Sequence, residues 1–280
     1  MNSEIRKFTN KLKDRDNMNN DEELSKKVHS WLETQGYATE MKVAMQLKKY
    51  NFGVLQSFYY DDPETNISRE IDVIARSIDN GGLLEMFSVI ECKKSQKPWI
   101  VFTSEASVQN RITSFAVMGE TTKSSIIKNI TKMLQIDWLR KEGRVGYSIT
   151  EAFTNKEDSS FKAGISATKA AISLSKSNQL AGVNYFNFYF PTVVFDGQLF
   201  ECYLDENGNS VVNEVSSVFL NFQIKFGEYQ GASIHIVKLD FFETYCRELE
   251  KTFIQLKQIL KLDRKRLALS LGMDPNLVED

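Results

Sequence analysis

Apolar and polar positions alternate along the chain in patterns that predict where its helices begin and end. Two helices are predicted near the start, at residues 21–36 and 40–50, because apolar residues recur there every three or four positions. Residues 1–20 are rich in Asn, Lys and Asp and lack this period, which predicts a flexible arm.

Strand-like patterns follow at residues 54–60, 70–77 and 84–93, and Asn80-Gly81-Gly82 is typical of a hairpin turn between the last two. Pro191 indicates an edge strand or a bulge in the strand that contains it. The pattern beyond the hairpin predicts helices at 104–118, 124–141 and 164–180, strands at 185–195, 199–203, 211–226 and 232–239, and one long or broken helix at 239–269.

Length and composition are those of a globular protein. The 280 residues are 42% hydrophobic and 26% charged, which excludes collagen-like and wholly disordered classes and suffices for a sizeable core. We expect one main domain at 21–238 with an inserted helical segment at about 104–160, followed by a C-terminal helical segment at 239–280.

Charged residues interrupt two of the apolar strands, and this is the most informative pattern in the chain. Asp72 lies in one strand, and Glu91 and Lys93 share a face of the next. A two-residue Gly81-Gly82 loop would place Asp72 directly opposite Glu91, whereas an Asn80-Gly81 loop would make the two diagonal neighbours on one face. Facing carboxylates repel unless something bridges them, and Mg²⁺ is a natural bridge. The alternative is a solvent-exposed face on which Lys93 pairs with Glu70.

These residues resemble the motif of the PD-(D/E)XK nuclease superfamily, and in particular its Mrr-like restriction endonuclease branch. In that family an acidic residue ends one strand and E-x-K lies on the next, usually after a helix that carries a glutamate. Asp72 and Glu91-Cys92-Lys93 match these positions, and Glu40 matches the helix glutamate less closely. Ile71 stands where the older motif has proline, a common substitution in the Mrr-like branch. The resemblance covers residues 22–99 best and residues 164–195 more loosely.

The resemblance implies an α/β fold, with a restriction-endonuclease-like mixed central sheet flanked by helices, additional C-terminal strands and a terminal helix. It also implies Mg²⁺, or Mn²⁺ as a substitute, held by Asp72, Glu91 and the backbone carbonyl of Cys92. Glu40 would be a further ligand or would orient water, and Lys93 would orient or deprotonate the attacking water.

The implied activity is endonucleolytic hydrolysis of DNA, in restriction, phage defence or repair. Two alternatives stay open, namely cleavage of RNA and a non-catalytic nucleic-acid-binding or scaffold module on the same fold. Because one active site cuts one strand, a homodimer or a larger defence complex is a further possibility.

The charge balance limits how the chain could bind nucleic acid. It has 35 basic and 37 acidic residues, a net charge of −2 and a pI near 5.9, so contact with phosphates would depend on a local patch. Six basic residues on two predicted helices are the candidates for this patch: Lys123, Lys128, Lys132, Lys257, Lys261 and Arg264.

Other chemistries have little support in the sequence. The two histidines, His29 and His235, are far apart in the sequence, which disfavours hydrolases with several histidine ligands and predicts structural roles for both. The pattern SxxK occurs at Ser166–Lys169 and at Ser173–Lys176, and both occurrences are expected on ordinary helix surface.

The cysteines and the hydropathy indicate the cellular compartment of the protein. Its 3 cysteines lie far apart without a CxxC pair, which is typical of a reducing compartment rather than of a disulfide scaffold. No apolar run is long enough for a membrane span, and no signal peptide is evident. We therefore expect a cytoplasmic protein without a membrane partner.

Overall fold

The structure is a computed structural model that describes residues 22–33, 35–105, 117–118, 120–136, 138, 143–154, 158–180, 185–222 and 232–278. The chain divides into two compact units, Met1–Ala38 and Thr39–Asp280. The predicted arm at 1–20 lies outside the described residues. Within the first unit, residues 22–33 form a helix whose Leu24, Val28 and Trp31 are exposed.

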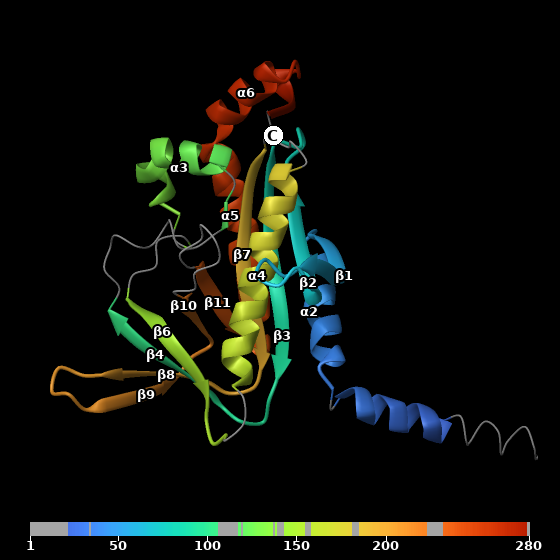
Figure 1. The fold of residues 1–280 in the computed structure, drawn as a ribbon, viewed down its shortest axis with the longest axis vertical. Coiled ribbons are helices and arrows are strands. Elements are labelled where there is room, and N and C mark those ends of the chain that lie inside the picture. Colours follow the sequence, from blue (N-terminus) through green and yellow to red (C-terminus); the bar gives the residue numbers. More distant parts are fainter. Residues whose placement is uncertain are drawn as a thin grey trace, which may run out of the picture. The chain divides into compact units, whose positions relative to one another are not determined.

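The second unit is built on one mixed sheet (Figure 1). Ten of its strands follow the order β1-β2-β3-β7-β11-β10-β6-β4-β8-β9, and β5 pairs with β7 beside this path. The strands are β1 (Gly53–Asp61), β2 (Ser68–Ile78), β3 (Leu84–Lys94), β4 (Trp99–Glu105), β5 (Val117–Met118), β6 (Arg144–Glu151), β7 (Phe186–Asp196), β8 (Leu199–Leu204), β9 (Ser210–Glu214), β10 (Ser217–Phe222) and β11 (Ala232–Lys238). Neighbouring strands are antiparallel except for the pairs β3–β7, β7–β11, β6–β10 and β4–β8, which are parallel.

Helices cover both faces of this sheet, as the sequence predicts for an α/β fold. On one face, α2 (Tyr37–Lys49) and α5 (Phe242–Ile259) pack in the same core cluster as Ile90. On the other face, α4 (Ser159–Leu180) packs its small residues against Val89, the neighbour of Ile90 on β3. Figure 1 shows α4 running along β3 and β7. The remaining helices are α3 (Glu120–Met133), α6 (Lys261–Ser270) and the short 3₁₀ helices η2 (Leu239–Phe241) and η3 (Pro275–Val278).

The prediction of a helical insertion at 104–160 is wrong for most of its described part. β4 extends to Glu105, and β5 and β6 belong to the same sheet, so only α3 and the start of α4 are helical there. Most of the helix predicted at 104–118 falls in residues 106–116, which lie outside the described part of the chain. Alternate residues of β4 are buried against the partner strands β6 and β8, which are distant in sequence, so the local pattern did not reveal the strand.

Two other predictions change in detail. Pro191 lies inside the central strand β7 rather than at an edge, but neither β5 nor β11 pairs with it, so its missing N–H removes no hydrogen bond on that side. The helix predicted at 239–269 is broken at Leu260, where α5 ends before α6 begins.

Candidate active site

The hairpin of β2 and β3 has the register that the sequence predicts for facing carboxylates. Val73 lies opposite Ile90, and this is the last facing pair before the ladder reaches Asp72 and Glu91, where the Cys92 N–H donates to the Asp72 side chain instead. The turn is longer than predicted, because residues 80–83 form its loop. The Asp79 N–H donates to the Leu84 carbonyl at 3.0 Å, closing this loop. An even number of loop residues keeps the same face alignment as a two-residue turn, which is why the register survives.

Burial governs the charge state of the two carboxylates. Burial raises the pKa of the Asp72 carboxyl, and the Glu70 charge raises it further, against the backbone N–H of Cys92 and the charge of Lys93. That Cys92 N–H donates to Asp72 Oδ2 at 2.7 Å. Burial likewise raises the pKa of Glu91, and the charge of Asp72 adds to this effect, while Lys93 opposes it. Both carboxylates therefore carry their negative charge at an energetic cost.

Lys93 is the cation of the site. Its Nζ donates to Glu91 Oε1 at 2.5 Å and to the Cys92 carbonyl at 3.3 Å. Burial lowers the pKa of Lys93, but the Glu91 charge and hydrogen bond outweigh it and leave the pKa above its usual value. Lys93 therefore keeps its proton. It donates to Glu91 and to the Cys92 carbonyl, which the family resemblance assigns to the metal. The predicted alternative is an ion pair between Lys93 and Glu70, but Lys93 pairs with Glu91 in the structure.

Glu40 approaches the same carboxylates from the first turn of α2. The buried face of this helix consists of Thr39, Val43, Ala44 and Leu47, so Glu40 lies beside it and is half-buried. Burial raises the pKa of Glu40, and so do the charges of Asp72 and Glu70, whereas Lys93 lowers it. The structure therefore brings Glu40, Asp72 and Lys93 within electrostatic range of one another, and Glu91 within range of Asp72 and Lys93.

The donor atoms suit a cation, although they are not arranged around one. Glu91 Oε2 is buried and accepts no hydrogen bond from the described residues. Across that part of the chain, no group of three or more His, Cys, Asp or Glu side chains is positioned to hold a metal ion. A buried carboxylate oxygen without a donor is costly, and a cation is one means of satisfying it. The oxygens of Asp72, Glu91 and the Cys92 carbonyl are of the ligand type that Mg²⁺ prefers, but Lys93 donates to Glu91 Oε1 and to the Cys92 carbonyl in the structure.

Residues of α4 adjoin the site, and the sequence patterns did not identify them as part of it. The Ser166 hydroxyl lowers the pKa of Glu91, and the Ser166 carbonyl accepts a hydrogen bond from the Tyr60 hydroxyl at 3.4 Å. One turn later, Lys169 is only 8% exposed, so the prediction that Ser166–Lys169 is ordinary helix surface is wrong. The sequence does indicate this burial, because many small residues surround Ser166 and Lys169, and such residues are typical of a helix face packed on a sheet.

Lys169 belongs to a cluster of charges that we call the Asp62 corner, formed by the buried Asp62 and Lys169 and the exposed Glu64 and Arg69. The Lys169 Nζ donates to Asp62 Oδ2 at 2.9 Å and to Glu64 Oε2 at 2.6 Å. The Arg69 Nε donates to Asp62 Oδ2 at 2.7 Å. Burial raises the pKa of Asp62, but the backbone N–H of Glu64 and the ammonium of Lys169 outweigh it and leave the pKa lowered.

Arg264 is wrongly predicted as a nucleic-acid contact. Its side chain is 1% exposed and donates to Asp79 Oδ2 at 2.5 Å and to the Lys257 carbonyl at 2.7 Å. Arg264 therefore ties α6 to the turn of the β2–β3 hairpin, a structural role that the run of basic residues around it concealed.

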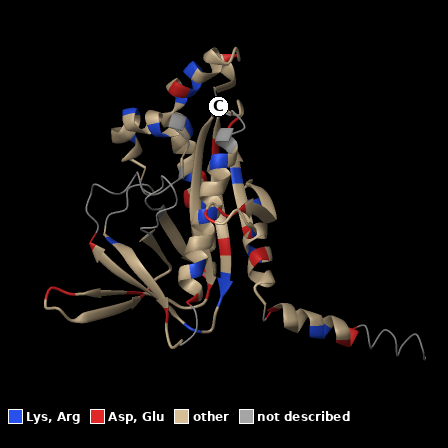
Figure 2. Ribbon diagram, viewed as in Figure 1, with Lys and Arg blue, Asp and Glu red and all other residues tan. Residues whose placement is uncertain are grey.

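The other basic candidates lie on α3 and α5–α6, far from the carboxylates. Lys128, Lys132 and Lys261 are exposed, and Lys123 and Lys257 are half-buried. α3 contacts α6 through the Ser125 hydroxyl, which donates to Asp263 Oδ2 at 2.8 Å. α6 packs at the turn end of the hairpin, seven residues of β3 before Glu91, or roughly 23 Å along the strand. Figure 2 shows basic positions on α3 and α6 beyond one end of β3 and further charges along β3 towards its other end.

The two histidines lie in different units. His29 is exposed on the helix of the first unit, and His235 is buried in β11. None of the helices in the described residues is both long and apolar enough to cross a membrane.

Comparisons with known proteins add no relative. No protein-family model matches the chain, and neither a curated protein nor a solved structure is significantly similar to it.

Proposed function

We propose that this chain is a metal-dependent endonuclease that hydrolyses DNA phosphodiester bonds. The observation that carries the proposal is that Asp72 of β2 and Lys93 of β3 interact with Glu91 of β3 and with Glu40 of α2, with burial raising the pKa of all three carboxyls. Buried charged groups with raised pKa values beside a specific charge partner cluster at functional sites. The unpartnered Glu91 Oε2 supports this interpretation.

The arrangement of the sheet also supports a restriction-endonuclease-like fold. The family resemblance covers two separate stretches of sequence, which correspond in the second unit to α2 and β1–β3, and to α4 and β7. These stretches form one layer of neighbouring strands, because β7 pairs in parallel with β3 over the full length of both strands. The strands β4–β6 and β8–β11 then extend the sheet beyond β7.

The residues divide the chemical work. Mg²⁺ held by Asp72, Glu91 and the Cys92 carbonyl would place positive charge against the phosphate oxygens as negative charge develops in the transition state. Lys93 keeps its proton, so it serves by donating a hydrogen bond that orients the attacking water or a phosphate oxygen. Glu40 has a raised pKa and lies at the rim, where it can accept a proton from that water.

The test is nicking of supercoiled plasmid by the full chain with millimolar Mg²⁺ or Mn²⁺ and with chelator. We expect Asp72→Ala and Lys93→Ala each to lower the nicking rate by at least about 100-fold, the usual loss when one charge-stabilising group is removed from an active site. Glu206→Gln, at an exposed turn between β8 and β9, is the matched control and should nick like the wild type.

Three outcomes would overturn the proposal. These are a wild-type chain that nicks no plasmid with either metal, a variant at Asp72 or Lys93 that retains near-wild-type nicking, and nicking that persists in chelator. A labelled RNA of the same sequence, run in parallel, separates DNA cleavage from RNA cleavage. The placement of this activity in restriction, phage defence or repair is part of the proposal and follows from the Mrr-like resemblance.

A further inference from the structure

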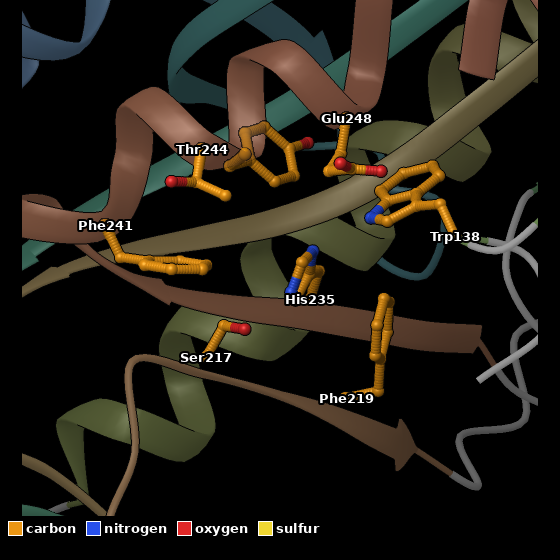
Figure 3. A pocket seen from close by; sticks show the side chains of 8 residues that line it. Trp138, Ser217, Phe219, His235, Phe241, Thr244 and Glu248 are labelled. Atoms are coloured by element: carbon orange, nitrogen blue, oxygen red, sulfur yellow. The ribbon is translucent and has the colours of Figure 1, made fainter. Parts of the chain in front are cut away.

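A pocket of about 210 Å³ lies among α5, β10, β11 and Trp138 (Figure 3). Its walls are largely aromatic, and the ring of His235 stacks on Phe219 with the ring centroids 4.0 Å apart. Phe241 and Tyr245 line the side formed by η2 and α5. The volume is below the roughly 300–1,000 Å³ of sites for drug-sized ligands, so the pocket suits a single planar ring system.

Among the polar side chains that line the pocket, Trp138 and Glu248 define what such a ring must offer. Trp138 Nε1 is buried and has no hydrogen-bond partner among the described residues, and Figure 3 shows this nitrogen directed into the pocket. The Glu248 carboxylate lines the pocket beside it. A ligand should therefore present an acceptor to the indole N–H and donors to the carboxylate, which accepts hydrogen bonds but cannot donate them when ionised. The Tyr245 hydroxyl already binds Ser88 and Thr192, so Tyr245 contributes its ring alone.

We propose that this pocket binds a nucleobase, and that guanine fits it best. A nucleobase is a flat ring system that stacks on aromatic side chains and carries donors and acceptors in its own plane. Guanine presents a carbonyl oxygen next to two N–H donors, which matches one indole N–H next to one carboxylate. A quaternary ammonium ion would meet aromatic rings and an acid too, but it offers the Trp138 N–H no acceptor.

The pocket is separate from the candidate active site, so this inference goes beyond the proposed nuclease. His235 pairs with Thr192 of β7, and Thr192 pairs with Ile90 of β3, one residue before Glu91. The pocket thus lies at the level of Glu91 along the strands, two strands away. Because side chains alternate along a strand, His235 and Glu91 point to opposite faces of the sheet. The base could belong to a free nucleotide or to a nucleic-acid strand that reaches this face.

The experiment is titration of the full chain in chelator with GMP, AMP, CMP and UMP, followed by tryptophan fluorescence and calorimetry. We expect saturable binding with GMP about tenfold tighter than UMP, because guanine makes one more hydrogen bond to a charged acceptor. Trp138→Phe keeps the ring and removes the N–H, and Glu248→Gln keeps the shape and removes the charge. Each should weaken GMP binding by about tenfold.

Controls and outcomes separate this proposal from others. Glu250→Gln, an exposed acid on the same helix, and Trp31→Phe, an exposed indole of the first unit, should bind GMP like the wild type. Tighter binding of a single strand with one guanine in a thymine tract would assign the pocket to a strand. Binding of GMP alone would assign it to a free nucleotide.

No binding of any nucleotide would overturn the proposal, and so would equal binding of all four, or tighter binding of tetramethylammonium. If Trp138→Phe does not fold by circular dichroism, Glu248→Gln decides. Because both variants keep the four predicted catalytic side chains, their plasmid nicking without nucleotide should match the wild type, so failure of this proposal leaves the nuclease proposal untouched.

Discussion

Two clusters of buried charge flank α4, and they handle their carboxylates in opposite ways. In the Asp62 corner, Asp62 is completely buried, yet two backbone N–H groups and two cationic side chains donate to it, and its pKa is lowered. At the candidate active site, burial raises the pKa of Asp72 and Glu91, and Glu91 Oε2 has no donor among the described residues. Burial is common to both clusters, but only at the candidate active site does a buried carboxylate oxygen, Glu91 Oε2, lack a hydrogen-bond donor among the described residues. The difference between them is therefore the number of donors, which separates a charge that stabilises the fold from a charge available for chemistry.

The largest expected effect concerns the Asp62 corner. Lys169→Met removes one of the two cations that bind the Asp62 carboxylate, which is 0% exposed. Because Arg69 still binds Asp62, the loss should be that of a hydrogen bond to a charged group, about 1.5–3 kcal/mol of unfolding free energy. Thermal melting should show a fall of roughly 2–4 °C per kcal/mol for a domain of this size. Glu64→Gln is the control, because Glu64 is half-exposed and its pair with Lys169 should contribute less than about 1 kcal/mol. Equal melting of the two variants would mean that the Asp62 corner is not a stabilising cluster.

Asp72→Asn should have a smaller effect on the melting temperature, and should raise it rather than lower it. The folded-state pKa of Asp72 is raised, so the native state loses stability as the pH rises from the unfolded value of about 3.9 through the folded pKa. Asp72→Asn keeps an oxygen for the Cys92 N–H and removes this cost, so it should raise the melting temperature at neutral pH by a few degrees without added metal. The gain should disappear below about pH 4, where the wild-type carboxyl is protonated in both states.

Asp62→Asn supplies the matched comparison, because the lowered pKa of Asp62 reverses the sign. Asp62 contributes stability above its unfolded pKa and loses it as the pH falls through the folded pKa. The Asn variant should therefore melt lower than the wild type at neutral pH, and the difference should shrink in acid. If both Asn variants change the melting temperature in the same direction at neutral pH, the distinction between the two clusters fails.

The smallest effect concerns the basic residues on α3. Lys128 and Lys132 are exposed and lie at the turn end of the hairpin, away from the carboxylates. If they contact phosphates, the double variant Lys128→Gln, Lys132→Gln should make the plot of log affinity against log salt shallower by about 1.8, at about 0.9 per phosphate. The nicking rate at saturating DNA should stay at the wild-type value. An unchanged slope would remove α3 from the binding surface.

Sequence patterns predicted the hairpin well because local rules determine it. The even loop and the alternating strands suffice to set the register that brings Asp72 near Glu91, and the first turn of α2 suffices to bring Glu40 near Asp72. Ion pairs between residues far apart in the sequence could not be predicted from local patterns. Arg264 pairs with Asp79, which is 185 positions away, and Lys169 pairs with Asp62 across 107 positions, so both looked like surface charges. β4 and β6 were missed because their burial depends on strands that are distant in sequence.

The central claim is that Asp72 and Glu91 form a cation site, and metal-dependent melting tests it most directly. A metal that binds only the folded chain should stabilise it by about 2.7 kcal/mol at a hundredfold excess over Kd, or roughly 5–11 °C. We expect Mn²⁺ and Ca²⁺ each to raise the melting temperature of the wild type by this order and to shift Asp72→Asn far less, with Ca²⁺ supporting little cleavage. If neither ion shifts the wild type, or if both proteins shift equally, no metal binds between Asp72 and Glu91, and the account is contradicted.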